Sequence, residues 1–205
     1  MTQLSYAKEG KITKEMEYVA SVENIDPHIL RQNIAQGSVI IPANINHKNL
    51  KPVAIGKGVK TKVNANIGAS KVRACVEEEL EKIRLCIKYG ADTVMDLSTG
   101  GNLNEIRESI INESTIPIGT VPAYQVVEEN QTIEDLKPED WLDVIEQQAK
   151  QGIDFMTIHA GVCQKTLPLL RSRLTGVVSR GGAILVKWMK ANNKENPLYT
   201  QFEQI

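Results

Sequence analysis

The chain has 205 residues, of which 41% are hydrophobic and 24% are charged, the ordinary balance of a globular protein with one substantial core. Lys and Arg number 24 against 25 Asp and Glu, so the formal net charge is -1 and gives no general attraction to nucleic acid or to an anionic membrane. The sequence contains no apolar run of about 18 residues and no apolar signal-peptide core. We therefore expect a cytoplasmic protein without a membrane span.

The three cysteines, Cys75, Cys86 and Cys163, do not form a metal-binding pattern. No two of them have Cys-x-x-Cys spacing, and an odd number without a secretion signal is atypical of a disulfide framework. Cys75 and Cys86 fall inside one expected helix, where buried thiols behave as small hydrophobic side chains. The sequence therefore predicts no metal site and no iron–sulfur site built from these residues.

The N-terminal part, residues 1–55, predicts a helical segment and a connector ahead of a larger unit over residues 56–205. Residues 12–24 have the pattern of a polar helix. A second helix is expected over residues 26–37, because an Asp-Pro pair suits its first turn and a glycine suits its end. An apolar, strand-like run interrupted by a proline follows over residues 38–47.

From about residue 59, short apolar runs alternate with amphipathic stretches. The runs that predict strands cover residues 59–68, 91–100, 116–124, 153–161 and 175–182. The helical patterns between and after them cover residues 70–89, 102–113, 138–152, 164–173 and 182–191. This alternation is typical of βα units and a parallel sheet.

Two α/β architectures compete for this pattern, a doubly wound sheet and a (β/α)8 barrel. The G-x-G-x-x-G turn typical of dinucleotide-binding doubly wound folds is absent after the first strand. Polar residues lie at the C-terminal ends of all five runs, namely Asn64, Asn66, Asp96, Tyr124, His159, Ser179 and Arg180. In a barrel these ends converge on the mouth where the chemistry takes place. We therefore expect a (β/α)8 barrel of which about the first five βα units are present, so that the barrel is not closed.

Some of these motifs have both a functional and a structural interpretation. Ser-Arg-Gly-Gly at 179–182 opens a helix, so its backbone N–H groups and arginine suit a phosphate group, although a plain strand-to-helix turn also fits. His159 suits ligand binding, acid–base catalysis or a structural hydrogen bond. Asn64 and Asn66 share one face of a strand, where either a ligand or a neighbouring strand would satisfy their amides.

Taken together, the motifs resemble one enzyme family. The chain contains, in order and at family spacing, PANINH (42–47), NANIG (64–68), GADTVMDLSTG (90–100), PIGTVPAYQ (117–125), FMTIHAGV (155–162), TGVVSRGG (175–182) and KENPLYTQFEQI (194–205). This set closely resembles the phosphomethylpyrimidine synthase family, and the similarity covers essentially the whole chain.

The resemblance implies a barrel of the radical S-adenosylmethionine type that converts aminoimidazole ribonucleotide to hydroxymethylpyrimidine phosphate in thiamin biosynthesis. It also implies S-adenosylmethionine, a 4Fe-4S cluster and zinc as cofactors, and a homodimer as the assembly. The substrate-contacting positions that it implies are Asn66, Met95, Tyr124, His159, Ser179, Arg180 and Gly181. No catalytic residue and no metal ligand is assigned in this chain.

Several parts of the family pattern are absent from these 205 residues. The missing parts are an Asp-Gly-Leu-Arg segment, two metal-binding histidines and the Cys-x-x-Cys-x-x-x-x-Cys segment that holds the cluster. Three functions therefore stay open: a part of a functional synthase, a non-catalytic remnant that retains only a ribotide-phosphate binding surface, or a different barrel enzyme acting on a phosphorylated sugar. The third function requires its own acid–base pair, for which Asp96 and His159 are the main candidates.

Overall fold

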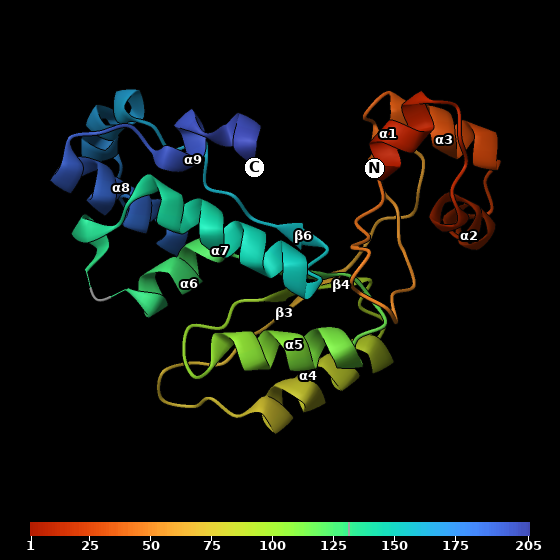
Figure 1. The fold of residues 1–205 in the computed structure, drawn as a ribbon, viewed down its shortest axis with the longest axis horizontal. Coiled ribbons are helices and arrows are strands. Elements are labelled where there is room, and N and C mark those ends of the chain that lie inside the picture. Colours follow the sequence, from red (N-terminus) through yellow and green to blue (C-terminus); the bar gives the residue numbers. More distant parts are fainter. Residues whose placement is uncertain (131) are drawn as a thin grey trace.

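A computed structural model describes residues 1–130 and 132–205 (Figure 1). The N-terminal part contains helices α1 (Gln3–Lys8), α2 (Lys14–Glu23) and α3 (Pro27–Ala35). Strands β1 (Val39–Ile40) and β2 (Ile55–Gly56) pair in an antiparallel hairpin. In Figure 1 the three helices, drawn in red and orange, lie together beside the rest of the chain.

The main sheet is parallel, and its strands are neighbours in sequence order. These strands are β3 (Asn64–Ile67), β4 (Thr93–Asp96), β5 (Ile118–Thr120) and β6 (Phe155–Met156). The α-helices that connect and follow them are α4 (Val76–Lys88), α5 (Leu103–Glu113), α6 (Pro122–Glu129), α7 (Pro138–Gln151), α8 (Arg180–Asn192) and α9 (Pro197–Thr200). Short 3-10 helices are η1 (Ile133–Asp135), η2 (Gln164–Ser172) and η3 (Phe202–Gln204). The chain is therefore an α/β protein with a parallel sheet, as predicted. Within the described ranges, no helix has the length and apolar character needed to cross a membrane.

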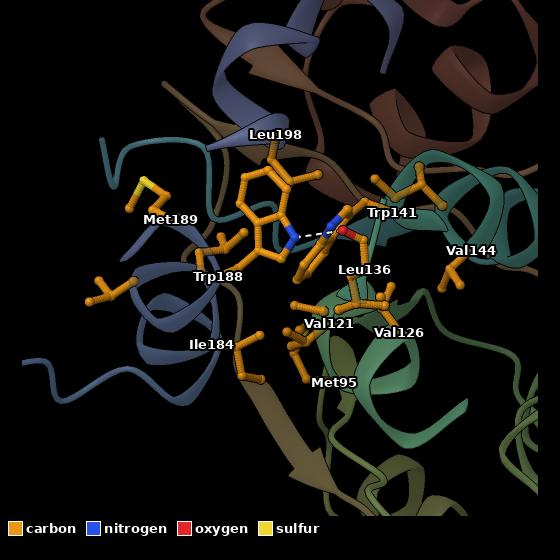
Figure 2. Packing of buried hydrophobic residues seen from close by; sticks show 14 residues of the cluster. Met95, Val121, Val126, Leu136, Trp141, Val144, Ile184, Trp188, Met189 and Leu198 are labelled. Atoms are coloured by element: carbon orange, nitrogen blue, oxygen red, sulfur yellow. Dashed lines mark hydrogen bonds between the residues drawn. The ribbon is translucent and has the colours of Figure 1, made fainter. Parts of the chain in front are cut away.

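The buried hydrophobic residues form separate clusters. One cluster places Trp141 of α7 and Trp188 of α8 side by side, and the indole N–H of Trp188 donates a 2.7 Å hydrogen bond to the carbonyl oxygen of Leu136 (Figure 2). A second cluster lies between strands β3 to β5 and helices α4 and α5, which pack against each other. A third belongs to α1, α2, α3 and the hairpin. The apolar stripes of the predicted helices therefore face buried clusters, as their spacing requires.

The fifth predicted strand, residues 175–182, is wrong. Its first residues have no strand pairing, and α8 already begins at Arg180. Gly176 has φ +60, a left-handed conformation that does not fit an extended strand. The carbonyl oxygens of His159 and Val162, which precede this segment, accept hydrogen bonds from the Asn196 side chain instead of from a further strand.

Two predicted helices also differ from the structure. The helix expected over residues 70–89 begins only at Val76, because Ser70 and Arg73 form a tight backbone bridge that leaves Val72 96% exposed. The segment predicted as a helix at 164–173 is the 3-10 helix η2, which contains Pro168. A proline supplies no N–H for an α-helical hydrogen bond.

Helices α1 and α6 were not predicted from the sequence. Helix α6 lies where the strand-like run 116–124 was expected to continue, and Pro122 occupies its first turn. Proline suits that position, because the N–H it lacks would have no partner within the helix. Tyr124 is consequently a helix residue and does not lie on a strand.

Candidate substrate-binding site

One face of the sheet carries two of the predicted site residues. Asn66 of β3 pairs in register with Met95 of β4, which pairs with Gly119 of β5, which in turn pairs with Phe155 of β6. Residues in register on parallel strands point to the same face. A Cβ atom on Gly119 would lie 2.3 Å from the Phe155 ring and 2.5 Å from the Met95 sulfur. Because Gly119 has no side chain, the Phe155 ring and the Met95 side chain can fill the space above it.

The amide of Asn66 is oriented by its neighbours on this face. Thr93 Oγ1 donates to Asn64 Oδ1 at 2.8 Å, and Asn64 Nδ2 donates to Asn66 Oδ1 at 3.2 Å. Asn66 is exposed, and no hydrogen bond within the described ranges uses its Nδ2 group. The side chain therefore offers N–H donors to a ligand.

Asp96 lies on the opposite face of the sheet, which corrects its predicted place at the mouth. It pairs in register with Ile67, which packs in the cluster under α4 and α5, and with Thr120, whose hydroxyl donates to Gln148 of α7. Its carboxylate accepts from the Ser98 N–H at 3.0 Å and from Ser98 Oγ at 2.5 Å. Burial raises the pKa of Asp96, and the hydrogen bonds from Ser98 only partly oppose this effect. The error arises because side chains alternate along a strand, so the residue after Met95 faces the helices.

His159 lies against the first turn of α8. Its Nε2 atom is 2.9 Å from Ser179 Oγ, which also accepts from the Gly182 N–H at 3.1 Å and so caps the helix. A Cβ atom on Gly181 would lie 2.3 Å from the His159 ring, so the imidazole rests directly on the glycine backbone. Burial lowers the pKa of His159, which favours a neutral ring. Nδ1 is buried and has no hydrogen-bond partner among the residues that the structure describes.

Arg180 lies beside α6. Its guanidinium carbon is 5.1 Å from the centroid of the Tyr124 ring, within the range of a cation–π contact. Its Nη2 atom is 3.3 Å from Oε1 of Glu128, which follows Tyr124 by one helical turn. Helix α6 therefore presents both a ring and a carboxylate to Arg180.

The structure brings most of the predicted site residues together. Tyr124, Arg180, Ser179, His159 and Gly181 form one connected group at the starts of α6 and α8. Asn66 and Met95 lie side by side on β3 and β4, and Met95 and Tyr124 belong to the same apolar cluster. The group arises although the strand predicted to carry Ser179 is absent, because the cap of α8 holds that residue against His159.

Sequence reasoning missed a buried pair formed by His47 and Asp154. His47 lies in the PANINH motif, and Asp154 directly precedes β6. Two asparagines of the same motif also bind this end of α7: Asn44 Nδ2 donates to the carbonyl oxygen of Ile153, and Asn46 Nδ2 donates to that of Lys150. The motif therefore fastens the N-terminal connector to the start of β6. The three polar side chains of the motif, Asn44, Asn46 and His47, were the sequence signal that could have predicted these contacts.

The cysteines do not fit an iron–sulfur cluster. Cys75 is exposed at the start of α4, outside the helix where it was predicted, Cys86 is half-buried in α4, and Cys163 is buried beside η2. Burial raises the pKa of Cys86, whereas a metal ligand must be a thiolate. In the part of the chain that the structure describes, no group of three His, Cys, Asp or Glu side chains could hold a metal ion.

Comparison of the chain with protein-family models identifies the family to which it belongs. The model of the radical SAM ThiC family matches residues 2–205, which is nearly the whole chain. Members of a radical SAM family are enzymes that use S-adenosylmethionine with an iron–sulfur cluster, and the ThiC family is connected with synthesis of the thiamin pyrimidine. The chain therefore belongs to the radical SAM ThiC family.

Proposed function

We propose that this chain provides the substrate-binding part of a phosphomethylpyrimidine synthase, which converts aminoimidazole ribonucleotide to hydroxymethylpyrimidine phosphate. The observation that carries the proposal is the contact of His159, Ser179 and Gly181 beside Arg180 at the start of α8. These groups suit a ligand that has a phosphate at one end and a polar ring at the other.

The start of α8 supports binding of the phosphate end. The first N–H groups of a helix have no partner within the helix. Here Ser179 Oγ and the Ser179 carbonyl oxygen accept from the N–H groups of Gly182 and Ala183, at 3.1 and 2.9 Å. This arrangement leaves the N–H groups of Arg180 and Gly181 for an anion, and the arginine adds charge-assisted hydrogen bonds.

The remaining residues suit the imidazole and ribose groups of a ribotide. His159 Nδ1 is a buried polar atom without a partner in the described ranges, so a ligand that hydrogen-bonds to it would remove an energetic cost. The Tyr124 hydroxyl and the Asn66 amide add hydrogen-bonding groups, and Met95 adds an apolar contact. We therefore propose that all seven predicted residues contact the substrate. These residues are Asn66, Met95, Tyr124, His159, Ser179, Arg180 and Gly181.

S-Adenosylmethionine and the 4Fe-4S cluster supply the radical chemistry of this family when they are bound. The cysteines described above do not fit the cluster, so the roles that we assign to this chain are binding and orientation of the substrate. The proposal also includes a (β/α)8 barrel, a bound zinc ion, a homodimer, and a division of the chain into residues 1–55 and 56–205. The parallel order of β3 to β6 supports the barrel, and the family resemblance supports the zinc and the homodimer.

The misfit of the cysteines also favours a second candidate function, a non-catalytic protein that binds a ribotide phosphate. Both candidates predict the same binding site, and they differ in turnover. Addition of the cluster-bearing part of a family member should produce hydroxymethylpyrimidine phosphate under the first candidate only. The placement of Asp96 on the helix-covered face counts against the third function, because one of its two acid–base candidates is then buried and hydrogen-bonded to Ser98.

Calorimetric titration tests the proposed site. The 205-residue chain should bind aminoimidazole ribonucleotide more tightly than the riboside that lacks the phosphate. Arg180→Ala should weaken ribonucleotide binding by roughly 10- to 100-fold, because hydrogen bonds from a charged group typically contribute an affinity change of this size. Arg84→Ala is a matched control, because Arg84 is 50% exposed and paired with glutamates, as Arg180 is 49% exposed and paired with Glu128. Equal affinity for the ribonucleotide and the riboside would contradict the proposal.

A further inference from the structure

Lys71 reaches the same carboxylate as Arg180, although it comes from the loop after β3. Lys71 Nζ lies 2.8 Å from Oε2 of Glu128, and Arg180 Nη2 lies 3.3 Å from Oε1 of Glu128. The Glu128 side chain is mostly buried, whereas both cations are substantially exposed. The two positive side chains therefore converge on one site from different loops.

The backbone around Lys71 is held by the loop that follows β4. The Ala69 N–H donates to Ser98 Oγ at 3.0 Å, and the Thr99 N–H donates to the Ala69 carbonyl oxygen at 2.8 Å. A Cβ atom on Gly100 would lie 2.5 Å from the Lys71 backbone nitrogen, so the two loops are in direct contact. The Lys71 backbone is consequently held by its contacts with the loop after β4, whereas its side chain is exposed.

We propose that Lys71 is a second cation of the phosphate site, and that Glu128 occupies the place of the anion until a phosphate monoester displaces it. This inference rests on the proposed function, which places the phosphate at Arg180. Lys71 and Arg180 carry two positive charges, and Glu128 balances only one of them. A phosphate monoester carries close to two negative charges at neutral pH and three acceptor oxygens, so it matches both cations better than the carboxylate does.

The arrangement also predicts a preference among phosphates. Arginine binds phosphate oxygens in a planar fork, whereas lysine acts as a point charge. A phosphodiester carries a single negative charge and therefore offers less to the second cation. The site should select terminal phosphate groups, as in a ribotide, over bridging ones.

Binding of ribose 5-phosphate, ribose and the methyl diester of ribose 5-phosphate to the 205-residue chain tests this inference. Lys71→Met should weaken binding of ribose 5-phosphate roughly tenfold and should reduce the preference for the monoester over the diester. Lys187→Met is the matched control, because Lys187 is also an exposed lysine, paired with Glu134 at 2.9 Å, and it should bind as the unmodified chain does. Glu128→Gln should bind ribose 5-phosphate several-fold more tightly, because the competing charge is gone.

The possible outcomes separate the two proposals. If Lys71→Met binds as Lys187→Met does while Arg180→Ala is weakened, Lys71 has no role and the proposed function stands. If the unmodified chain binds ribose 5-phosphate no better than ribose, the phosphate site and both proposals fail. If Glu128→Gln binds as weakly as Arg180→Ala, Glu128 holds Arg180 in place and the displacement is overturned. Thermal unfolding of each variant verifies that the fold is retained.

Discussion

His47 Nδ1 lies 2.7 Å from Oδ2 of Asp154, and both side chains are completely buried. Nε2 of the same ring lies 3.0 Å from the carbonyl oxygen of Ser114, which can only accept a hydrogen bond. Because both ring nitrogens face acceptors, both donate and the ring is an imidazolium. Burial lowers the pKa of His47, but the hydrogen bonds to Asp154 and Ser114 and the attraction to Asp154 outweigh it, so the pKa is raised above 6.5.

This pair predicts a pH-dependent stability. A histidine whose pKa is raised by folding contributes its full stabilisation below the unfolded pKa of about 6.5, and it loses that contribution as the pH rises through the higher folded value. His47→Gln should lower the free energy of unfolding by about 3 kcal/mol at pH 6, the usual cost of breaking a buried pair. The difference from the unmodified chain should shrink toward pH 9. Urea titrations across this range measure it.

His28→Gln is the control for this experiment, because His28 is an exposed histidine in the first turn of α3. It should change the free energy of unfolding by less than about 0.5 kcal/mol at any pH, as surface substitutions do. A His47→Gln difference that stays constant with pH would show that folding does not raise the pKa of His47.

Gln125, the residue after Tyr124, predicts a second effect on stability. Its Oε1 atom accepts from Nη2 of the buried Arg107 and from Nε2 of Gln148 at 2.7 Å. Gln125→Leu should lower the free energy of unfolding by about 3 kcal/mol, because it removes the hydrogen-bond acceptor of Nη2 of a buried arginine, whose Nη1 is bonded to Asn104 and Gln151. Gln147→Leu, at a half-buried position of the same network, should cost less because water replaces the lost partner.

A double substitution distinguishes the charge from the packing in this network. Arg107→Met combined with Gln125→Leu should be more stable than Gln125→Leu alone, because the buried charge that lost a hydrogen bond is gone. Chemical unfolding of the two single variants and the double variant gives the coupling energy. Strictly additive losses would show that Arg107 does not depend on Gln125.

Substitution of two neighbouring glycines of α8 by alanine should affect the His159 ring differently. Gly181→Ala should displace the His159 ring, because the new Cβ atom would lie 2.3 Å from it, and the hydrogen bond with Ser179 would be lost. In Gly182→Ala the nearest atoms to the new Cβ atom belong to the Val177 and Ser179 side chains, at 3.3 to 3.4 Å, so the better helix propensity of alanine should roughly offset the contact. Imidazole NMR signals and ribonucleotide affinity should change in the first variant and stay near normal in the second. An unchanged His159 signal in Gly181→Ala would contradict the packing described here.

Anaerobic reconstitution with iron and sulfide tests the assignment of the cysteines. Cys75, Cys86 and Cys163 differ in exposure and are not members of a three-residue metal-binding group in the described ranges. We expect far less than one 4Fe-4S cluster per chain by iron and sulfide analysis. A stoichiometric cluster with its characteristic absorption would show that the cysteines rearrange around it.

Much of the architecture follows from local sequence patterns. The apolar runs at 59–68, 91–100, 116–124 and 153–161 each contain one strand of the parallel sheet, because short buried strands flanked by amphipathic helices have few alternative arrangements. The helical pattern expected over residues 102–113 likewise contains α5, whose first turn is capped by the Asn102 side chain accepting from the Glu105 N–H. Where a signal depends on residues within one turn or one strand, the sequence is sufficient.

Long-range contacts decided the rest. The run at 175–182 is as apolar as a strand, but nothing local shows that Gly176 turns or that Asn196 takes the preceding carbonyl groups. Likewise, Met95 and Asp96 are adjacent on β4 and therefore face opposite sides of the sheet, but only the packing of the sheet decides which side faces α4 and α5. The sequence shows which side chains are polar or apolar, whereas the packing of the whole sheet decides whether such a side chain faces the helices.

For the candidate site, the sequence predicted which residues take part, and the tertiary structure decided how these residues are arranged. Tyr124, His159 and Arg180 were selected from motif and position, and they lie in one group as expected. The convergence of Lys71 and Arg180 on Glu128, and the burial of His47 with Asp154, join residues more than 50 positions apart. Such pairs form because packing desolvates and orients charges from separate elements, and that physical effect has no counterpart in the local sequence.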